Sequence, residues 1–391
     1  MTDPAPRVRR RPRTPGRLLP LLLATALLLP VAFLVAQSHR LIDADRAVVE
    51  RERLGVEYLR ALGPVTNALV NSQSAAVTGR ALPRDALDKA VEQATAVDVR
   101  VGGDLNTSER WAGLRAKLEA LPERPLADPE VAFTTYGEVT DLLLALHGKV
   151  RETSGLIRDS GADSYFLQDG VGEEMPEAMV AAGRLTDLAV LINRRPATDR
   201  IQSLSQLATL RGAAVQPAND LADNLRAVVD STESAELGAT VLTPFDAYQR
   251  AFEAMALYAQ PSDRVGTVDT TRLIAARNEA QTAAQLLQPV LLDEIDRLLA
   301  KRIDQMDRDD LLVLGAGSLA ALLLLALAAN LWVSRPRDNS AAAGADGGGL
   351  VESPRPTDTR WKPATSRPAG ELQPLGQAHE PDRWRPFDAA R

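Results

Sequence analysis

Two uncharged apolar runs interrupt a chain that is otherwise mixed in polar and apolar residues. They cover residues 18–36 and 311–333, and no run of this kind occurs in the 274 residues between them. Each run is about 20 residues long, which is the length that a helix needs to cross roughly 30 Å of hydrocarbon. The pattern therefore predicts a two-span membrane protein whose large middle region lies on one side of the membrane.

Between the two runs, apolar residues recur at helical spacing. One stripe consists of Phe245, Tyr248, Phe252, Met255 and Ala259. Such a stripe indicates a helix that packs one face into a core, and no strand-type alternation persists in this region. The predicted fold class is all-α, with the middle region forming an antiparallel helical bundle. It is either two stacked bundles or one long bundle with inserted helices.

Local signals set the expected ends of several helices. Thr243, Pro244 and Asp246 are typical of a helix start, because they offer a capping hydroxyl, a proline at the first helical position and an acid in the first turn. The expected loops between helices are residues 102–103, 121–129 and 231–243.

The helices that meet the apolar runs are expected to be continuous with them. No proline or turn cluster interrupts residues 41–58, which follow the first run. Leu292, Ile295, Leu299 and Met306 keep a coiled-coil-like spacing up to the second run. A helix that enters the membrane without a hinge can transmit an axial shift or a rotation, so this continuity permits signalling.

Basic residues set the expected orientation. Six arginines and one acid precede the first run, and Arg335 and Arg337 directly follow the second. Basic residues near a span remain preferentially in the cytoplasm, so both termini are predicted to be cytoplasmic and the protein to lie in the plasma membrane. The predicted domains are a basic N-terminus (1–17), a first transmembrane helix (18–36), an extracytoplasmic helical region (37–310), a second transmembrane helix (311–333) and a Pro-rich tail (334–391).

The alternative for the first run is a cleaved signal peptide. Its apolar stretch exceeds the length of about 7–15 residues that is usual for a signal peptide. Cleavage after Ala36 would also place the bulky Leu34 at a position that requires a small residue. An uncleaved anchor is therefore the favoured interpretation.

Charge and composition argue against several functions. The formal net charge is −7, and residues 37–310 hold 43 acidic against 30 basic residues. An acidic surface argues against nucleic acid as a partner, since phosphate binding needs a basic face. The chain has no cysteine, and its three histidines, His39, His147 and His379, show no ligand spacing. No metal, cofactor or catalytic set is predicted, and the chain is not expected to be an enzyme.

The most distinctive motif lies within residues 150–169. It reads Asp-Ser-Tyr-Phe-Leu-x-Asp and consists of Asp163, Ser164, Tyr165, Phe166, Leu167 and Asp169. The motif resembles a segment in the extracytoplasmic sensory region of bacterial chemoreceptors, sensor histidine kinases and diguanylate cyclases. Residues 52–64 and 292–306 resemble the same family, so the likeness covers most of residues 41–310. A broader likeness is to nitrate- and nitrite-sensing helical domains.

The resemblance implies a sensory region that pairs as a homodimer through its membrane-proximal helices. The small residues Ala316, Gly317, Ala320 and Ala321 could let two second spans approach closely.

One departure from the resembling family bears on the ligand. Many relatives carry a His-Arg pair shortly after the position of Pro64, and this chain has Ser72 and Gln73 there. No family ligand is therefore carried over.

Arg158, Asp159, Asp163 and Tyr165 are the candidate ligand-binding residues, because their polar groups can line a pocket where two helices meet. The alternative is a structural corner, in which Asp163 caps the second helix and Gly161 adopts a positive φ. A calcium loop is not expected, since the later glutamate of an EF-hand is missing at the required spacing.

The tail, residues 334–391, holds eight prolines and few large apolar residues. This composition predicts disorder, and its length predicts that a separate cytoplasmic protein carries any output. A repeated Arg-Trp-basic-Pro motif supplies the candidate docking residues Arg360, Trp361, Pro363, Arg383, Trp384 and Pro386. Docking of a bivalent partner, adsorption to anionic lipid and no function at all are equal alternatives for this repeat.

The predicted function is that of a sensor-like transmembrane protein. Its extracytoplasmic bundle receives a ligand or signal and relays it through the second span to a separate partner. The alternative is a membrane-anchored structural protein that tethers an envelope component to cytoplasmic machinery without sensing a small molecule.

Overall fold

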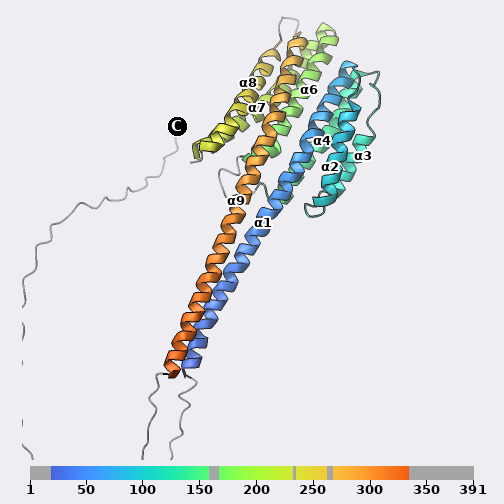
Figure 1. Cartoon of the computed structure of the whole chain (residues 1–391). Helices are drawn as coiled ribbons and strands as arrows, with labels where there is room; N and C mark the ends of the chain where they lie inside the picture. Colours follow the sequence, from blue (N-terminus) through green and yellow to red (C-terminus); the bar gives the residue numbers. More distant parts are fainter. Residues whose placement is uncertain (1–18, 158–166, 232–234, 262–266, 334–391) are drawn as a thin grey trace, which may run out of the picture. The chain divides into compact units, whose positions relative to one another are not determined.

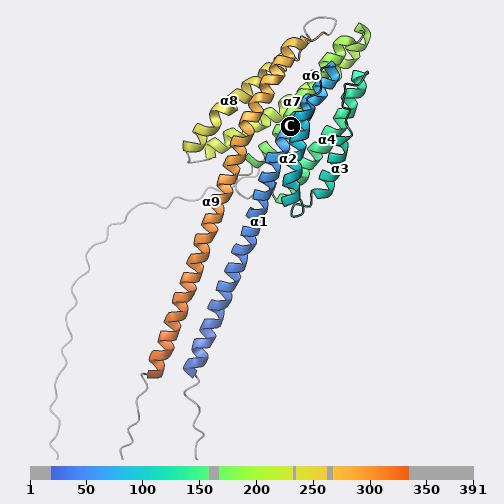
Figure 2. The ribbon, with the colours of Figure 1, turned by 45° about the vertical axis from the view of Figure 1, so that its right-hand side comes forward.

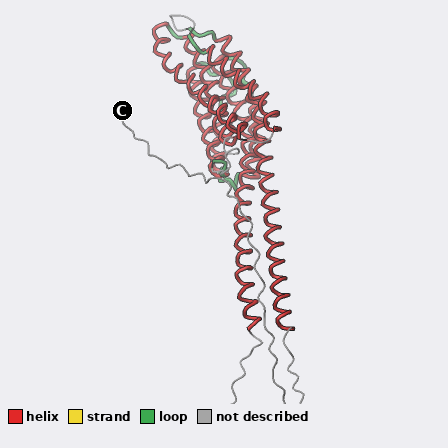
Figure 3. Tube along the Cα trace, turned by 90° about the vertical axis from the view of Figure 1, so that its left-hand side faces the viewer, coloured by secondary structure: helices red, strands yellow, loops and turns green. Residues whose placement is uncertain are grey.

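The structure is a computed structural model that describes residues 19–157, 167–231, 235–261 and 267–333. All of these residues fall in one compact unit of the chain, residues 1–335. Every regular element among them is helical (Figure 3). The prediction of an all-α fold is confirmed for this part of the chain.

The described elements are eight α-helices and one turn of π-helix. In chain order they are α1 (Leu19–Thr78), α2 (Arg84–Val101), α3 (Ser108–Glu119), α4 (Pro129–Ser154), η1 (Gly170–Glu174), α6 (Met175–Arg194), α7 (Ala197–Ser231), α8 (Ala235–Tyr258) and α9 (Thr270–Val333).

Two of the three predicted loops are confirmed. Helix α2 ends immediately before residues 102–103, and α3 and α4 flank residues 121–129. Helix α4 begins with an aspartate cap, since the Asp128 carboxylate accepts a hydrogen bond from the backbone N–H of Glu130 at 2.9 Å. The cap is followed by Pro129 at the first helical position, where a missing N–H costs nothing.

The predicted loop at residues 231–243 and the helix start at Thr243 are wrong. Helix α7 runs to Ser231, and α8 already begins at Ala235, so Pro244 lies inside α8. The reason is packing. Val241 is buried and extends the apolar stripe of Phe245 and Tyr248 backwards by one turn. This burial outweighs the single backbone hydrogen bond that a proline removes from a helix.

Helices α1 and α9 are long and apolar enough to cross a membrane. They are 60 and 64 residues long, and in each an apolar window lies wholly outside the packed interior. The two helices lie side by side and run in opposite directions (Figures 1 and 2). The predicted continuity with the core is confirmed, because the same two helices pass from the apolar windows into the buried core without a break.

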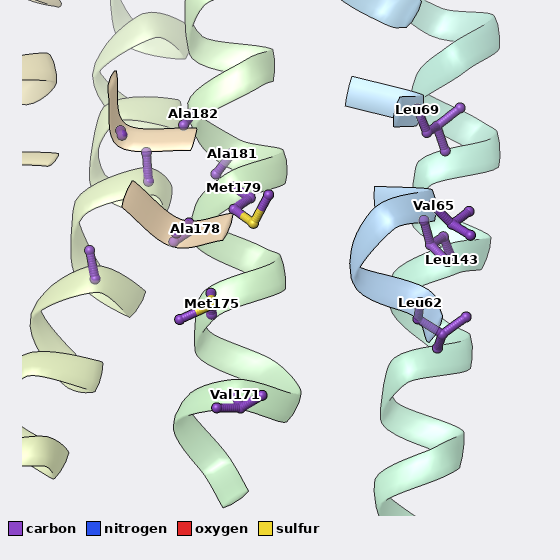
Figure 4. Packing of buried hydrophobic residues seen from close by; sticks show 14 of the residues in the cluster. Leu62, Val65, Leu69, Leu143, Val171, Met175, Ala178, Met179, Ala181 and Ala182 are labelled. Atoms are coloured by element: carbon purple, nitrogen blue, oxygen red, sulfur yellow. The ribbon is translucent and has the colours of Figure 1, made fainter. Parts of the chain in front are cut away.

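Helix α1 is central to the core. It packs against α2, α4, α6 and α9, while α3 lies against α2 and α4. Helices α6, α7, α8 and α9 pack in sequence on the other side, and α9 also contacts α6. Figure 4 shows Leu62, Val65 and Leu69 of α1 beside Leu143 of α4, and Met175 on α6.

The apolar stripes predicted from spacing are core residues. Phe245, Tyr248, Phe252 and Met255 of α8 are buried, and so is Ala259 directly after it. Leu292, Ile295 and Leu299 of α9 are also buried, and Met306 is half-buried against the core. These side chains stabilise the fold by burying apolar surface, at about 25 cal/mol per Å² removed from water.

Candidate functional site

The four predicted ligand residues, Arg158, Asp159, Asp163 and Tyr165, lie outside the described residues, as do the six docking residues of the tail. Helix α4 ends before them, at Ser154. Gly155 follows with φ +94°, the left-handed conformation that glycine adopts at low cost. On either side of the four ligand candidates, the structure describes a polar cluster. It consists of Arg151 of α4 together with η1 and Asp169, which is the last residue of the motif.

Arg151 of α4 holds two carboxylates beside η1. It is buried, and its guanidinium forms ion pairs with Asp169 and Glu173. The arginine can pass this close to η1 because residue 172 is glycine. A Cβ there would stand 2.5 Å from the Arg151 Cδ. A π-turn widens the helix locally and often marks a functional position.

Glu174, the last residue of η1, is a buried acid. Its Oε1 accepts a hydrogen bond from Asn224 of α7 at 2.9 Å, while Oε2 has no partner among the described residues. Burial, then the negative charge of Asp169, raises the pKa of Glu174 to about 8. The acid is therefore mostly protonated at neutral pH. Burial, and then the negative charge of Glu174, raises the pKa of the buried Tyr248 hydroxyl on α8.

A second polar group lies in the core where α1, α6 and α9 meet. We refer to it as the core polar network, which consists of Asn67, Asn71 and Gln73 of α1, Asp187 of α6, and Arg277 and Gln281 of α9. Gln73 donates to Asp187 at 3.1 Å, Arg277 donates to Asn71 at 2.9 Å, and Gln281 donates to Asn67. The network thus links three helices through hydrogen bonds, of which the Gln73–Asp187 bond is buried and those to Asn67 and Asn71 are partly buried.

Both charges of the core polar network are buried, with Asp187 1% and Arg277 2% exposed. Burial raises the pKa of Asp187 to about 6, opposed by Ser74 and by the charge of Arg277. Burial lowers the pKa of Arg277, and the charge of Asp187 opposes this shift. Each charge therefore stabilises the other in a place where an isolated charge is costly.

Ser72 and Gln73, which stand where the resembling sensory regions carry a His-Arg pair, lie at and beside this network. Ser72 and Gln73 are both buried; Ser72 bonds the backbone carbonyl of Ala68 and Gln73 bonds Asp187. Gln73 thus makes a structural hydrogen bond between α1 and α6.

A row of ion pairs joins α1 and α9, beginning beside the apolar windows and continuing alongside the core. The pairs are His39–Asp310 at 2.7 Å, Arg46–Asp307 at 2.8 Å, Arg53–Asp296 at 2.8 Å and Arg60–Asp293 at 2.7 Å. The basic members stand seven residues apart on α1, which puts them on one face of the helix. This row of complementary charges favours one register of the two helices.

Two prolines lie in the same part of this helix pair. Pro64 of α1 and Pro289 of α9 line one groove of about 320 Å³, together with Arg60 and Gln285. A helical proline leaves the carbonyl four residues earlier without its usual donor, and those carbonyls belong to Arg60 and Gln285. Both helices therefore lose a backbone hydrogen bond beside the same groove.

No group of three or more histidine and acidic side chains that could hold a metal ion occurs in the part of the chain that the structure describes. The described polar groups instead hold buried charges and a protonated acid in the core.

Arg151, Glu174 and the core polar network were not predicted from the sequence. A polar residue on a helix is normally taken to face the solvent, so its burial is not visible in the sequence. The row of ion pairs had a signal, namely His39, Arg46, Arg53 and Arg60 at heptad spacing.

No family model, curated protein or solved structure matches this sequence. The likeness to bacterial sensory regions therefore stays a prediction that rests on the residues that carry it.

Proposed function

We propose that the chain is a sensor-like membrane protein. Its extracytoplasmic helical bundle, residues 37–310, receives a ligand or signal, and α9 relays it through the second span to a separate cytoplasmic partner. One observation carries the proposal: α1 and α9 each provide both an apolar membrane-length window and part of the buried core. A change in the core therefore acts directly on the segments that meet the membrane.

The core polar network supports this proposal. Buried charges have few alternative arrangements in which every charge keeps a partner. A perturbation is therefore expected to move the network from one discrete arrangement to another, and not through a continuous series. Asp187 lies on α6, and its hydrogen-bond partner and the neighbouring Arg277 lie on α1 and α9. A ligand that displaces α6 would thus change the contacts of both α1 and α9.

The proposed orientation keeps both termini in the cytoplasm and the protein in the plasma membrane, as the basic residues beside the spans favour. The proposed cytoplasmic partner binds the two Arg-Trp-basic-Pro motifs of residues 334–391. Two weak sites on one tail raise the effective concentration for the second contact and favour a bivalent partner.

A chimeric receptor tests the relay. Residues 1–333 are joined in frame to the cytoplasmic half of a sensor histidine kinase, and kinase output is recorded in cells exposed to a panel of small anions, amino acids and organic acids. We expect at least one compound to change the output. The matched control inserts four glycines after Leu299, which breaks α9 below the core, and it should remove the response without preventing membrane insertion.

The tethering alternative predicts a different result. The full chain in detergent would show no saturable rise in melting temperature with any compound of the panel, since only ligands that bind the folded state raise it. Absence of both a melting shift and a change in kinase output would overturn the sensor proposal and leave the structural role.

A further inference from the structure

A small cavity lies between α4 and the η1–α6 segment. Its volume is about 50 Å³, and polar side chains of His147, Arg151, Glu173 and Glu177 contribute to its wall. His147 and Arg151 are 2% and 6% exposed, whereas both glutamates are exposed at the surface. The two buried residues therefore form its inner wall, and the glutamates stand towards the solvent side.

The proton of the neutral His147 ring can be assigned from its neighbours. Thr66 donates its only hydroxyl hydrogen to the backbone carbonyl of Leu62 at 3.1 Å. With that hydrogen directed at Leu62, the Thr66 oxygen accepts from Nε2 of His147, which also lies 3.1 Å away, and we assign the tautomer on this arrangement. Nε2 thus carries the ring hydrogen, and Nδ1 is left as a bare acceptor.

Nδ1 of His147 and Nε of Arg151 both lack a hydrogen-bond partner among the described residues. The first is an acceptor and the second a donor, and they stand one helical turn apart on α4 beside the same cavity. A buried polar atom left unpaired costs about 1–3 kcal/mol, so the pair favours an occupant that satisfies both.

We propose that this cavity binds one neutral hydroxyl group, which donates a hydrogen bond to Nδ1 of His147 and accepts one from Nε of Arg151. The hydroxyl belongs to a water molecule or to a small alcohol. The inference concerns the cavity alone and holds whether or not the chain is a sensor.

The chemistry of the wall selects a hydroxyl over an ion. A metal cation cannot accept the hydrogen of Arg151 Nε and is repelled by the guanidinium, while a simple anion cannot donate to a bare Nδ1 and meets two carboxylates. A hydroxyl both donates and accepts. A site for one water needs roughly 10–15 Å³ of this kind of volume, so the cavity has room for water or a small alcohol.

Nuclear magnetic resonance of the full chain in detergent tests the proposal, because the chain has only three histidines. With ¹⁵N-labelled histidine we expect His147 to show the Nε2–H tautomer, a hydrogen-bonded Nδ1 and no titration between pH 5 and 8, since burial and the charge of Arg151 lower its pKa to about 3. Methanol is then added in steps. A saturable shift confined to His147 identifies an alcohol site, whereas cross-relaxation from water to His147 without a methanol shift identifies bound water.

The variant Thr66→Val gives an independent readout that preserves side-chain shape. It removes the acceptor that holds the hydrogen on Nε2, so a fraction of His147 should change to the Nδ1–H tautomer and weaken the occupant's signal. The control Gly113→Ala on α3, away from the cavity, adds a methyl group that meets no atom within 4 Å and should keep the wild-type tautomer. An Nδ1 nitrogen that is protonated in the wild type, or that shows no hydrogen bond in water and in methanol alike, overturns the proposal.

Discussion

Gly317 of α9 lies against Val35 of α1, within the two apolar windows. A Cβ added to Gly317 would stand 2.6 Å from Val35 Cγ2 and 3.7 Å from Val35 Cβ. The missing side chain thus lets the two predicted spans of one chain approach closely. Gly317, Ala320 and Ala321 are half-buried, whereas Ala316 is exposed. Part of the small-residue group that suggested pairing between two chains is therefore used within one chain.

The Val35–Gly317 contact predicts an engineered disulfide. The natural chain has no cysteine, and the Cβ–Cβ separation of 3.7 Å lies in the range that a disulfide needs. The variant Val35→Cys/Gly317→Cys should oxidise in membranes to a faster-migrating monomer on a non-reducing gel. The control Leu34→Cys/Gly317→Cys should not, because Leu34 is 65% exposed and faces away. A band of twice the mass would show instead that the predicted spans of two chains meet.

Thiol labelling in intact cells tests the proposed topology. Val99 on α2 is 81% exposed, so Val99→Cys offers an accessible thiol in a region without other cysteines. We expect a membrane-impermeant maleimide to label it from outside, while Ser340→Cys in the tail should be labelled only after permeabilisation. Labelling in the reverse order would contradict the prediction that both termini are cytoplasmic.

Much of the fold was predictable because helical stripes carry a periodic signal. Phe252 and Leu299, for example, were recognised from spacing and are buried. The start of α8 was not predictable, because Thr243 and Pro244 form a good local helix start that a longer helix overrides. The local start signal was outweighed by the burial of Val241, which depends on where the neighbouring helices lie.

The candidate site was much less predictable. Arg151 and Glu173 are 22 residues apart and Gln73 and Asp187 are 114 apart, so no local spacing links them. A polar residue such as Arg277 also looks in sequence like part of a solvent-facing stripe, although it is 2% exposed. Burial of polar side chains is decided by the packing of whole helices, which a single sequence does not reveal.

The core polar network should show strong energetic coupling. Arg277→Gln removes a charged donor from Asn71, which should cost about 1.5–3 kcal/mol of unfolding free energy, and Asp187→Asn should also destabilise the fold. Each single change removes the opposite charge that Asp187 and Arg277 offer each other. The double variant should therefore be more stable than the sum of the two effects predicts, by roughly 0.5–3 kcal/mol in denaturant unfolding. Simple additivity would show that the two charges act independently.

The row of ion pairs should contribute little to stability. Arg53 and Asp296 are each 42% exposed, and exposed pairs typically add about 0.2–1 kcal/mol that salt screens. Arg53→Ala should therefore lower the unfolding free energy by less than about 1 kcal/mol. If the row sets the register, Arg53→Asp should weaken cross-linking of the Val35→Cys/Gly317→Cys pair, and adding Asp296→Arg should restore it. Unchanged cross-linking in Arg53→Asp would show that apolar packing alone sets the register.

Glu174 should make the fold less stable as the pH rises. Its pKa is about 8 in the folded chain and near 4.5 in the unfolded chain, so between these values the folded state retains a proton that the unfolded state has lost. The unfolding free energy should fall with rising pH across this window, by at most about 1.4 kcal/mol per pH unit from this group.

The variant Glu174→Gln tests this expectation, because it keeps an oxygen that can accept from Asn224 but cannot ionise. Its advantage over the wild type in denaturant unfolding should grow from pH 5 to pH 8, while the control Glu92→Gln on the surface of α2 should track the wild type. A constant difference between Glu174→Gln and wild type over this range would mean that Glu174 is ionised in the folded chain.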